Sequence, residues 1–515
     1  MTPTTPPILS ATREADSEKT AAATVPPHYP IPPMTLTQPP PTHLQTLIDT
    51  YTRRTPTSKQ MAAANRPVLA DKTAIGYAFS PEIKEMCYPI VAVRSQGSRL
   101  WDIDGNEYID ILMGLGTNLF GHNPSFIKAA IAEQLDQGMQ IGPQSETVGE
   151  VAQLARELTG LERITFSNTG TEAVMTAVRV ARTATQRTKI AVFTNSYHGH
   201  FDAALMRAPL SEYARKKAVR SLQKKPLLSP LANFMQTFLG TRAVPAALGV
   251  PNATAKDVLV LDYGNPKSLD VIKAQRNQLA AVLVEPVQSR CPELQPREFL
   301  HALRDLTQST GIALIFDEMV TGFRVHPGGA QAHFGIQADI ATYSKIVGGG
   351  LPLSIIAGQA QFMDHIDGGP WQFGDDSAPQ VPLTFFAGTF CKHPLALAAA
   401  RAALQHLKNQ GPTLQETLNQ QTANLVDRLN AFTTSINMPI QFTRFGSFFA
   451  IALSQSQISP TALSLFSYHL LNQGIHLRGG DRGGFLSTAH TPDDIDTIYT
   501  AICNALTALK ENSNV

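Results

Sequence analysis

Two continuous apolar runs constrain the fold of this chain more than any other feature of its sequence. Residues 312–316 read IALIF, and residues 279–287 read LAAVLVEPV, which is apolar up to Glu285. A strand that is apolar at every position is typical of a parallel sheet covered on both faces. The helical pattern EFLHALRDLTQSTG at 298–311 separates the two runs. We therefore predict an α/β fold with a mostly parallel central sheet wrapped by helices.

Polar residues follow the ends of these strand-like runs. Asp317 and Glu318 come directly after residues 312–316, and Lys345 follows another short run, residues 340–344. Functional groups of parallel sheets gather at the carboxyl ends of the strands, where we expect Asp317 and Lys345 to meet. A lysine amine can hold the aldehyde of pyridoxal phosphate (PLP) as a Schiff base, while a carboxylate keeps the pyridine nitrogen protonated. The pattern suits a PLP site built on Lys345 and Asp317. Taken singly, each residue is more often an ordinary strand end or loop residue, so the prediction depends on the further motifs of the chain.

A glycine turn between a strand and a helix predicts a phosphate site. Residues 164–166 form a short predicted strand, and NTGTE at 168–172 opens a helix. Free N–H groups and the positive end of the helix dipole attract an anion there, with hydroxyls available from Thr169 and Thr171. Glycine is also common at such turns for backbone reasons alone, so the turn by itself leaves both interpretations open.

Composition and charge exclude several classes of protein. The 42 basic and 41 acidic residues give a net charge of +1, which offers no electrostatic case for binding nucleic acid or an anionic membrane. No apolar run approaches the roughly 18 residues that span a bilayer, and no secretory signal is visible. The four cysteines are scattered, and His198 and His200 have no further ligand at metal-site spacing. We therefore expect a cytoplasmic protein without a metal site.

Two motifs resemble the signature of class III (fold type I) PLP-dependent aminotransferases, the group that contains glutamate-1-semialdehyde aminomutase and ornithine aminotransferase. They are DEMVTGFR at 317–324 and TYSKIVGGGLP at 342–352. NTGTEA at 168–173 is also similar to the family's NSGTEA, with Thr169 in place of serine. The resemblance covers about residues 45–505. It implies fold type I: a large domain with a mostly parallel central sheet wrapped by helices, plus a small α+β domain.

The resemblance also implies a role for each residue of the site. Lys345, Asp317 and Tyr197 would be catalytic, with the Tyr197 ring stacked on the cofactor. Gln288 would approach the cofactor's 3-hydroxyl, and Met319 would lie under the ring, where the family commonly has valine. The complete set of expected cofactor-binding residues is Thr169, Gly170, Thr171, Tyr197, His198, Glu285, Gln288, Asp317, Met319, Lys345 and Thr389.

Partners and a substrate are implied in the same way. Thr389 corresponds to a residue that reaches the phosphate of the neighbouring subunit's cofactor, so a homodimer with shared active sites is expected. The insert WQFGDDSAPQVP at 371–382 is unlike aminomutases and resembles the aminotransferase domains of hybrid polyketide–peptide synthases. The acceptor would then be a β-ketoacyl thioester on an acyl carrier protein, aminated to a β-aminoacyl thioester with glutamate or glutamine as donor. The resemblance indicates no residue for the donor's α-carboxylate. By chain position, in the turn before FLSTAHT, Arg478 and Arg482 are the candidates, and the alternative that they are ordinary surface arginines stays open.

Two alternative functions remain open. One is an intramolecular amino shift like that of glutamate-1-semialdehyde 2,1-aminomutase, against which the insert and the proline-rich N-terminus count. The other is an inactive dimerisation or docking module of a synthase. The presence of Asp317, Lys345 and the turn at Gly170 disfavours this second alternative.

The chain divides into four predicted parts, the first from its composition and the others from the strand–helix pattern and the resemblance. Residues 1–45 hold 11 of the 36 prolines and show no apolar periodicity, so we predict a disordered linker like those between synthase modules. Residues 46–145 are expected to contribute to the small domain and the active-site mouth. Residues 146–385 form the predicted large PLP-binding domain, and residues 386–515 the C-terminal small domain.

Two local patterns stand out in the second of these parts. The turn DGN at 104–106 lies between alternating runs and predicts a β-hairpin. The loop LGTNLFGHNP at 115–124 mixes aromatic and amide groups, and it offers Asn118, Phe120 and His122 as candidates for lining a pocket.

Overall fold

The computed structural model describes residues 41–72, 79–209 and 243–512. The predicted linker, residues 1–45, therefore lies outside the described residues up to position 40. Its last residues instead begin helix α1 (Pro41–Arg54). A proline suits this position because its fixed φ matches the first turn of a helix.

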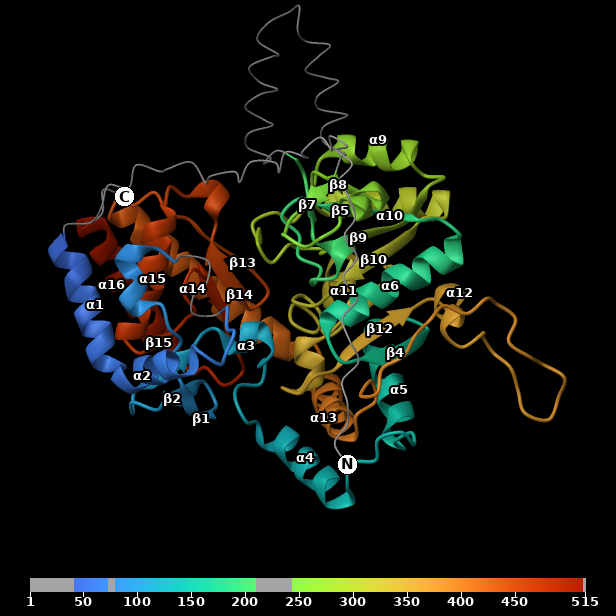
Figure 1. The fold of residues 1–515 in the computed structure, drawn as a ribbon, viewed down its shortest axis with the longest axis horizontal. Coiled ribbons are helices and arrows are strands. Elements are labelled where there is room, and N and C mark those ends of the chain that lie inside the picture. Colours follow the sequence, from blue (N-terminus) through green and yellow to red (C-terminus); the bar gives the residue numbers. More distant parts are fainter. Residues whose placement is uncertain (1–40, 73–78, 210–242, 513–515) are drawn as a thin grey trace, which may run out of the picture. The chain divides into compact units, whose positions relative to one another are not determined.

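A seven-stranded sheet is the central element of the fold (Figure 1). Its strands are β4 (Arg163–Ser167), β5 (Lys189–Phe193), β8 (Val258–Leu261), β9 (Leu279–Val284), β10 (Ala313–Asp317), β11 (Ile340–Tyr343) and β12 (Ser354–Gly358). They lie in the order β4-β12-β11-β10-β9-β5-β8. β10 pairs in parallel with β9 and β11, whereas β12 runs antiparallel to both its neighbours. The predicted mostly parallel sheet is therefore confirmed.

Helices pack on both faces of this sheet. They are α5 (Thr147–Thr159), α6 (Gly170–Thr185), α9 (Pro266–Ala274) and α10 (Arg297–Thr310). Leu314 and Phe316 of β10 lie in a core shared with α5 and α10, whereas Ala313 and Ile315 lie in a second core under α6. Every residue of β9 and β10 is buried. Because both faces of these strands are covered, their sequences need no polar alternation.

Residues near both ends of the described chain fold together beside the sheet. The helices are α1, α14 (Thr413–Ser435), α15 (Pro460–Asn472) and α16 (Pro492–Asn512). The strands are β1 (Ala92–Gln96), β2 (Arg99–Asp102), β3 (Glu107–Asp110), β13 (Phe442–Phe445), β14 (Phe448–Ile451), β15 (Ile475–His476) and β16 (Gly483–Phe485). β15 pairs in parallel with β3, β14 pairs antiparallel with β13 and β16, and α1 packs against α15. The N-terminal and C-terminal elements thus share one core.

The remaining elements connect these two groups. They are α2 (Pro56–Asn65), η1 (Pro81–Met86), α3 (Met113–Gly116), α4 (Ser125–Gln137), η2 (Asp202–Ala204), β6 (Met206–Arg207), β7 (Val244–Pro245), η4 (Asn252–Asp257), α11 (Gly329–Phe334), η5 (Lys345–Gly348), α12 (Ala360–Met363), η6 (Asp364–Ile366), α13 (Pro394–Gln410) and η7 (Leu453–Gln455). α13 packs against α4, α5 and η5. This packing holds the segment that begins at Lys345 against the body of the fold.

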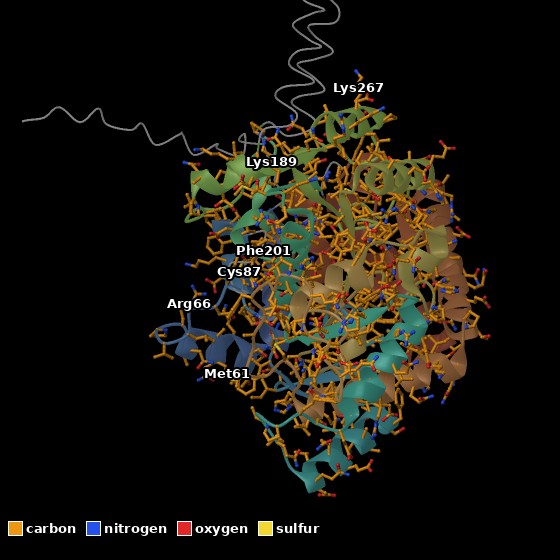
Figure 2. All side chains as sticks on the ribbon, turned by 90° about the vertical axis from the view of Figure 1, so that its right-hand side faces the viewer. Met61, Arg66, Cys87, Lys189, Phe201 and Lys267 are labelled. Carbon is orange, nitrogen blue, oxygen red and sulfur yellow. The ribbon has the colours of Figure 1, made fainter. Side chains whose placement is uncertain are left out.

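Figure 2 shows the side chains from a direction turned by 90°. Arg66 and Cys87 mark the N-terminal elements in that view, and Lys189 and Lys267 mark the region of β5 and α9. The chain's four cysteines, including Cys87, are free thiols. Within the described ranges, no helix combines the length and the apolar character needed to cross a bilayer.

The predicted hairpin around residues 104–106 is confirmed. β2 and β3 pair antiparallel, with Arg99 opposite Ile109, and Gly105 in the turn has a φ of +83°. The neighbouring Asp104 carboxylate accepts hydrogen bonds from the backbone N–H groups of Thr57 (2.6 Å) and Ser58 (3.0 Å). It therefore caps α2, a helix whose own N-cap residue makes no side-chain cap bond.

Replacing Asp104 with alanine should loosen the first turn of α2. Two N–H groups would lose their acceptor, which costs about 1 kcal/mol, so their hydrogen exchange should accelerate roughly fivefold. Exchange mass spectrometry over residues 56–60 measures this directly. Asp136→Ala, which removes an exposed carboxylate from α4, serves as the control. Unchanged exchange at Thr57 and Ser58 would mean that water caps the helix equally well.

Candidate active site

The carboxyl ends of five strands deliver polar residues to one edge of the central sheet. Asp317 ends β10, Lys345 follows β11, and Glu285 follows β9. The turn after β5 carries Tyr197 and His198, and the turn after β4 carries residues 168–171. β4, β5, β9, β10 and β11 all run in the same direction, which is why residues far apart in sequence meet at this edge.

Asp317 is fixed by hydrogen bonds from two segments. His198 Nδ1 lies 2.7 Å from its Oδ2, and the backbone N–H of Met319 donates to its Oδ1 at 3.1 Å. Both Asp317 and His198 are only 2% exposed. The other ring nitrogen of His198, Nε2, is buried and has no hydrogen-bond partner among the described residues. The carboxylate is thus oriented from one side by an imidazole and a backbone amide.

Lys345 is buried in a charged environment. Burial lowers the pKa of its amine to about 8, the negative charges of Asp317 and Glu285 oppose this, and the positive charge of Arg324 adds to it. The residue also has a φ of +53°, a left-handed conformation that is costly for a lysine. Such strain is typical of functional positions, where the surrounding structure holds it in place. An amine with a pKa near 8 can both accept and return a proton near neutral pH.

Glu285 positions the turn that carries Tyr197. Its Oε2 accepts from the Tyr197 N–H at 2.8 Å, and its Oε1 accepts from the N–H and hydroxyl of Ser289 at 3.2 and 2.9 Å. Burial raises the pKa of Glu285, His198 opposes that shift, and Asp317 adds to it. Gln288 is also buried, and its amide nitrogen donates to the Thr194 carbonyl at 2.8 Å.

The Tyr197 side chain remains 49% exposed, so one face of its ring is available to a ligand. The guanidinium of Arg290 lies 5.5 Å from the centre of this ring. Tyr197 therefore lies where the buried cluster opens to solvent, with a cation beside it.

The predicted phosphate turn forms the N-terminus of α6. The Thr169 hydroxyl accepts from the Glu172 N–H at 3.2 Å, and Glu172 Oε2 accepts from the N–H groups of Asn168 and Thr169 at 2.8 and 3.1 Å. This capping box uses three N–H groups. Those of Gly170 and Thr171 have no intrahelical acceptor and stay available for an anion.

Close approaches join this turn to the rest of the site. A Cβ on Gly170 would lie 2.8 Å from Met319 Sδ, and a Cβ on Gly199 would lie 2.5 Å from Thr171 Oγ1. Glycine is required at position 199, where φ is +82° and the Thr171 Cα would lie 2.9 Å from the added Cβ, whereas at position 170 the Met319 side chain would have to shift. Because of these contacts, the turns at 168–171, 197–199 and 317–319 form one continuous surface.

Thr389 lies apart from this cluster. It is exposed, in a loop whose Cys391 thiol lies 3.9 Å from the Asn168 amide nitrogen. The role of Thr389 in a neighbouring subunit stays a prediction.

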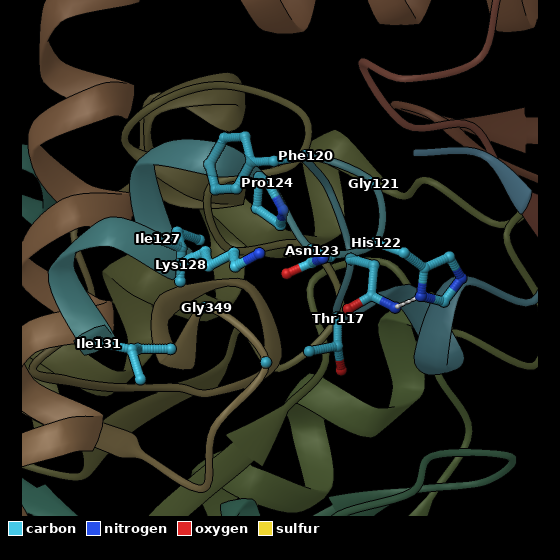
Figure 3. Close-up of a pocket in the computed structure, with 12 residues that line it drawn as sticks. Thr117, Phe120, Gly121, His122, Asn123, Pro124, Ile127, Lys128, Ile131 and Gly349 are labelled. Atoms are coloured by element: carbon cyan, nitrogen blue, oxygen red, sulfur yellow. Dashed lines mark hydrogen bonds between the residues drawn. The ribbon is translucent and has the colours of Figure 1, made fainter. Parts of the chain in front are cut away.

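The predicted pocket residues Asn118, Phe120 and His122 line one cavity of about 290 Å³ (Figure 3). Gly349, just beyond Lys345, and Lys128 of α4 also line it. His122 is oriented by Asp110, whose Oδ2 lies 2.7 Å from His122 Nε2. The cavity therefore opens between the loop at 117–124 and the segment that carries the lysine.

The two arginines considered as partners of the donor's α-carboxylate have different contacts in the structure. Arg478 donates through Nε and Nη2 to Asp481, at 3.1 and 3.0 Å. Arg482 is partly buried and donates to the backbone carbonyl of Arg290, the residue beside Tyr197. Arg482 is therefore connected to the exposed side of the cluster, whereas Arg478 already holds a carboxylate.

Sequence reasoning missed Glu318 and Arg324. Burial raises the pKa of Glu318 to about 7, and its carboxylate accepts from the N–H groups of Ala330 (3.0 Å) and Gln331 (2.9 Å). Arg324 is fully buried and acts electrostatically on Lys345. Both residues belong to DEMVTGFR, and the available signal was that this segment carries two charged side chains besides Asp317 among mostly apolar and small residues.

These features fit PLP. Lys345 would bind its aldehyde, Asp317 would pair with its ring nitrogen, and the Gly170 and Thr171 N–H groups would hold its phosphate. The unpartnered N–H groups, the lysine with a lowered pKa and the exposed Tyr197 ring each correspond to one part of that molecule.

Comparison with known proteins agrees with this geometry. The family model described as "Aminotransferase class-III" matches residues 80–483. Glutamate-1-semialdehyde 2,1-aminomutase of Ruminiclostridium cellulolyticum is 33% identical over 428 residues, covering 80% of this chain and 89% of that protein. The structure of an omega-transaminase from Sphaerobacter thermophilus has a TM-score of 0.74 at 27% identity, covering 88% of this chain and 98% of the other. A β-phenylalanine aminotransferase from Variovorax paradoxus has a TM-score of 0.73 at 25% identity, covering 91% and 98%.

The match to the family model extends over most of the folded chain and includes every strand that carries a residue of the candidate site. The fold neighbours and the family agree on the cofactor as well as on the architecture. The chain therefore belongs to the class III aminotransferases, PLP-dependent enzymes of fold type I.

Proposed function

We propose that this enzyme transfers an amino group from glutamate or glutamine to a β-ketoacyl thioester carried by an acyl carrier protein. Transamination is supported mainly by one observation: the amine of Lys345 is buried near the carboxylates of Asp317 and Glu285 and has a pKa of about 8. Such an amine can take a proton from one carbon of a bound substrate and return it to another. The amino group passes from the donor to the enzyme in one half-reaction and from the enzyme to the ketone in the other, and both half-reactions need this proton transfer.

The other residues of the site hold the reacting groups in place. When bound, the cofactor supplies an electron sink for the electrons of the substrate's Cα–H bond. Asp317, fixed by His198 and Met319 N–H, presents a carboxylate to the ring nitrogen. Glu285 fixes Tyr197 through its backbone, so that the phenol ring covers one side of the site. Tight packing at Gly170 and Gly199 fixes the anion-binding turn relative to both.

Two observations support a β-amino product on a carrier. The β-phenylalanine aminotransferase among the structural neighbours has a name that refers to a β-amino acid. The insert at 371–382 projects from the fold, with Phe373 93% exposed and Trp371 45% exposed. An exposed apolar arm of this kind supports contact with another protein chain.

The same exposure supports a homodimer. Large apolar side chains that the single chain leaves open gather in and after the insert, at Phe373, Leu383, Phe385 and Phe390. Thr389 lies within this stretch and is itself exposed. We propose that a second copy covers this segment and receives Thr389 at its phosphate site.

An aminomutase is the second candidate. The names of the curated relatives, at 32–33% identity, favour an intramolecular amino shift on glutamate 1-semialdehyde. The site residues described here serve either reaction, because both need a proton-transferring lysine and a paired carboxylate.

Isotope transfer distinguishes the two functions. We would incubate the enzyme with ¹⁵N-glutamate or ¹⁵N-glutamine and either a carrier-bound β-ketoacyl thioester or glutamate 1-semialdehyde, and read the products by mass spectrometry. A ¹⁵N-labelled β-aminoacyl carrier supports our proposal. Rapid conversion of the semialdehyde without incorporation of label would instead identify an aminomutase. A protein with no absorbance of bound PLP and neither activity would be a docking module.

Lys345→Ala should reduce turnover by at least about a thousandfold, because the variant lacks both the covalent link and the acid–base group. Borohydride reduction of the wild type followed by peptide mapping should place the cofactor label on Lys345. Lys189→Ala, at the start of β5, is the matched control and should keep full activity. A label on any other lysine would refute the assignment.

Asp317→Asn should keep PLP bound but slow proton transfer about a hundredfold or more, because an amide cannot keep the ring nitrogen protonated. Single-turnover absorbance measures this step. The control is Asp339→Asn, a buried carboxylate that accepts from Leu314 N–H (2.7 Å) and Arg304 (3.0 Å). That variant should lose stability and keep the chemical rate. Equal rates for Asp317→Asn and wild type would remove Asp317 from the site.

Arg482→Lys should impair the donor half-reaction and spare the acceptor half-reaction, because lysine cannot reproduce a bidentate contact with a carboxylate. The two halves can be measured separately from the aldehyde and amine forms of the enzyme. Arg478→Lys, on the same turn but paired with Asp481, is the control. Equal losses in both halves would indicate that Arg482 has a structural role.

A further inference from the structure

Arg324 is the largest fully buried side chain of the described residues, with 2% exposure. Its Nη1 donates to the Ser447 hydroxyl at 2.8 Å, and its Nη2 donates to the Gly116 carbonyl. The guanidinium carbon lies 4.8 Å from the centre of the Phe485 ring. All of these partners are neutral, and Nε has none among the described residues.

A buried cation without a carboxylate is unusual, because desolvation of an unpaired charge is costly. Arg304 and Arg163 of this chain have acidic partners: Arg304 pairs with Asp339 at 3.0 Å, and Arg163 pairs with Asp364 and Asp367. Arg187 and Arg482 donate to backbone carbonyls as Arg324 does, but they are only partly buried. Burial lowers the pKa of Arg324 to about 9, so its guanidinium still carries a charge at neutral pH. The fold therefore maintains a positive charge here at a cost in stability.

This charge acts on Lys345. Three charged groups affect the lysine: the carboxylates of Asp317 and Glu285 favour its protonated form, and Arg324 disfavours it. Within the described part of the chain, Arg324 is thus the cation whose charge opposes these two anions at the amine. Without it, the carboxylates would hold the proton on Lys345 more tightly.

The same guanidinium also holds a strained turn. Four consecutive residues, Met113 to Gly116, have positive φ values of 48°, 62°, 57° and 88°. Left-handed backbone is costly at a non-glycine position, so Met113 and Leu115 need external support. A Cβ on Gly116 would lie 2.8 Å from Phe485 Cε1, so the Phe485 ring packs on this turn while Arg324 binds its last carbonyl. The loop at 117–124 follows directly, and most of its residues line the cavity that Gly349 and Gly350 also line, in the segment after Lys345.

We propose that Arg324 is a positioning residue of the active site with two separable contributions. Its two hydrogen bonds, to the Gly116 carbonyl and the Ser447 hydroxyl, fix the left-handed turn at 113–116, and its unpaired charge favours the neutral, proton-accepting form of the Lys345 amine over the protonated one. The inference rests on the proposed role of Lys345 as the acid–base group. The contacts of Arg324 are with Ser447, Gly116 and Phe485, and none of these residues belongs to the proposed cofactor site.

The charge contribution can be measured on the cofactor-free full-length chain, without turnover. Acetic anhydride reacts with neutral amines, so the pH profile of Lys345 acetylation, read on its peptide by mass spectrometry, reports the protonation midpoint. In Arg324→Met this midpoint should move upward by about one pH unit, because the opposing charge is gone. In Arg324→Lys, which retains a charge, it should stay near that of the wild type.

The contribution of the two guanidinium hydrogen bonds, to Ser447 and Gly116, is tested by a separate measurement. Hydrogen exchange at residues 113–118 should accelerate in Arg324→Lys as well as in Arg324→Met, because lysine cannot reach Gly116 and Ser447 together. The matched control is Arg297→Met. Arg297 also donates to two backbone carbonyls, at 2.8 Å each, and lies 5.1 Å from a phenylalanine ring, but it belongs to α10. It should change neither readout.

An unchanged acetylation midpoint in Arg324→Met would overturn the charge contribution, and so would an equal shift in Arg324→Lys. Unchanged exchange at 113–118 in both variants would overturn the contribution of the two hydrogen bonds. If Arg324→Met does not fold, Arg324→Gln tests the charge instead, since glutamine retains an N–H donor without a charge. If borohydride reduction placed the label on another lysine, the proposed function would be refuted. The acetylation profile would still show whether the charge of Arg324 affects the protonation of Lys345.

Discussion

The buried hydrogen bond between His198 Nδ1 and Asp317 Oδ2, 2.7 Å long, is the contact on which the rest of the site depends. It joins the ends of β5 and β10, two strands that β9 separates in the sheet. A carboxylate with 2% exposure keeps its charge in such a place only with strong donors around it. Because Tyr197 precedes His198 and Met319 follows Asp317, this one bond also fixes the residues proposed to lie on either side of the cofactor ring.

A balance of charges at Lys345 follows from this arrangement. Burial and Arg324 favour the neutral amine, while Asp317 and Glu285 favour the protonated one, and the resulting pKa is about 8. A group near that value can move a proton in both directions, which an aminotransferase needs in its two half-reactions. Backbone strain accompanies the balance: Lys345 itself and the turn at 113–116 are both left-handed. The surrounding packing allows this strain to persist: the sheet edge holds Lys345, and Arg324 and Phe485 hold the turn.

Much of this could be predicted from local sequence patterns. The apolar runs of β9 and β10 specify strands covered on both faces, the DGN turn specifies a hairpin, and NTGTE specifies the start of α6. In each case the residues that determine the local structure are neighbours in sequence, so a short stretch of sequence is sufficient to predict that structure. The motif DEMVTGFR indicated the family, but nothing local distinguishes its Arg324 from a surface arginine.

The sequence by itself therefore determined the fold class, the family and the positions of Lys345 and Asp317 at strand ends. Only the tertiary structure decided which distant groups meet there. It paired β15 with β3, turned β12 antiparallel although SIIAG resembles the parallel strands, and brought Gly116 and Ser447 to Arg324. It also bound Arg478 to Asp481 and brought Arg482 next to Arg290. The physical reason is that burial and hydrogen bonding between segments hundreds of residues apart depend on packing of the whole chain, which no short pattern encodes.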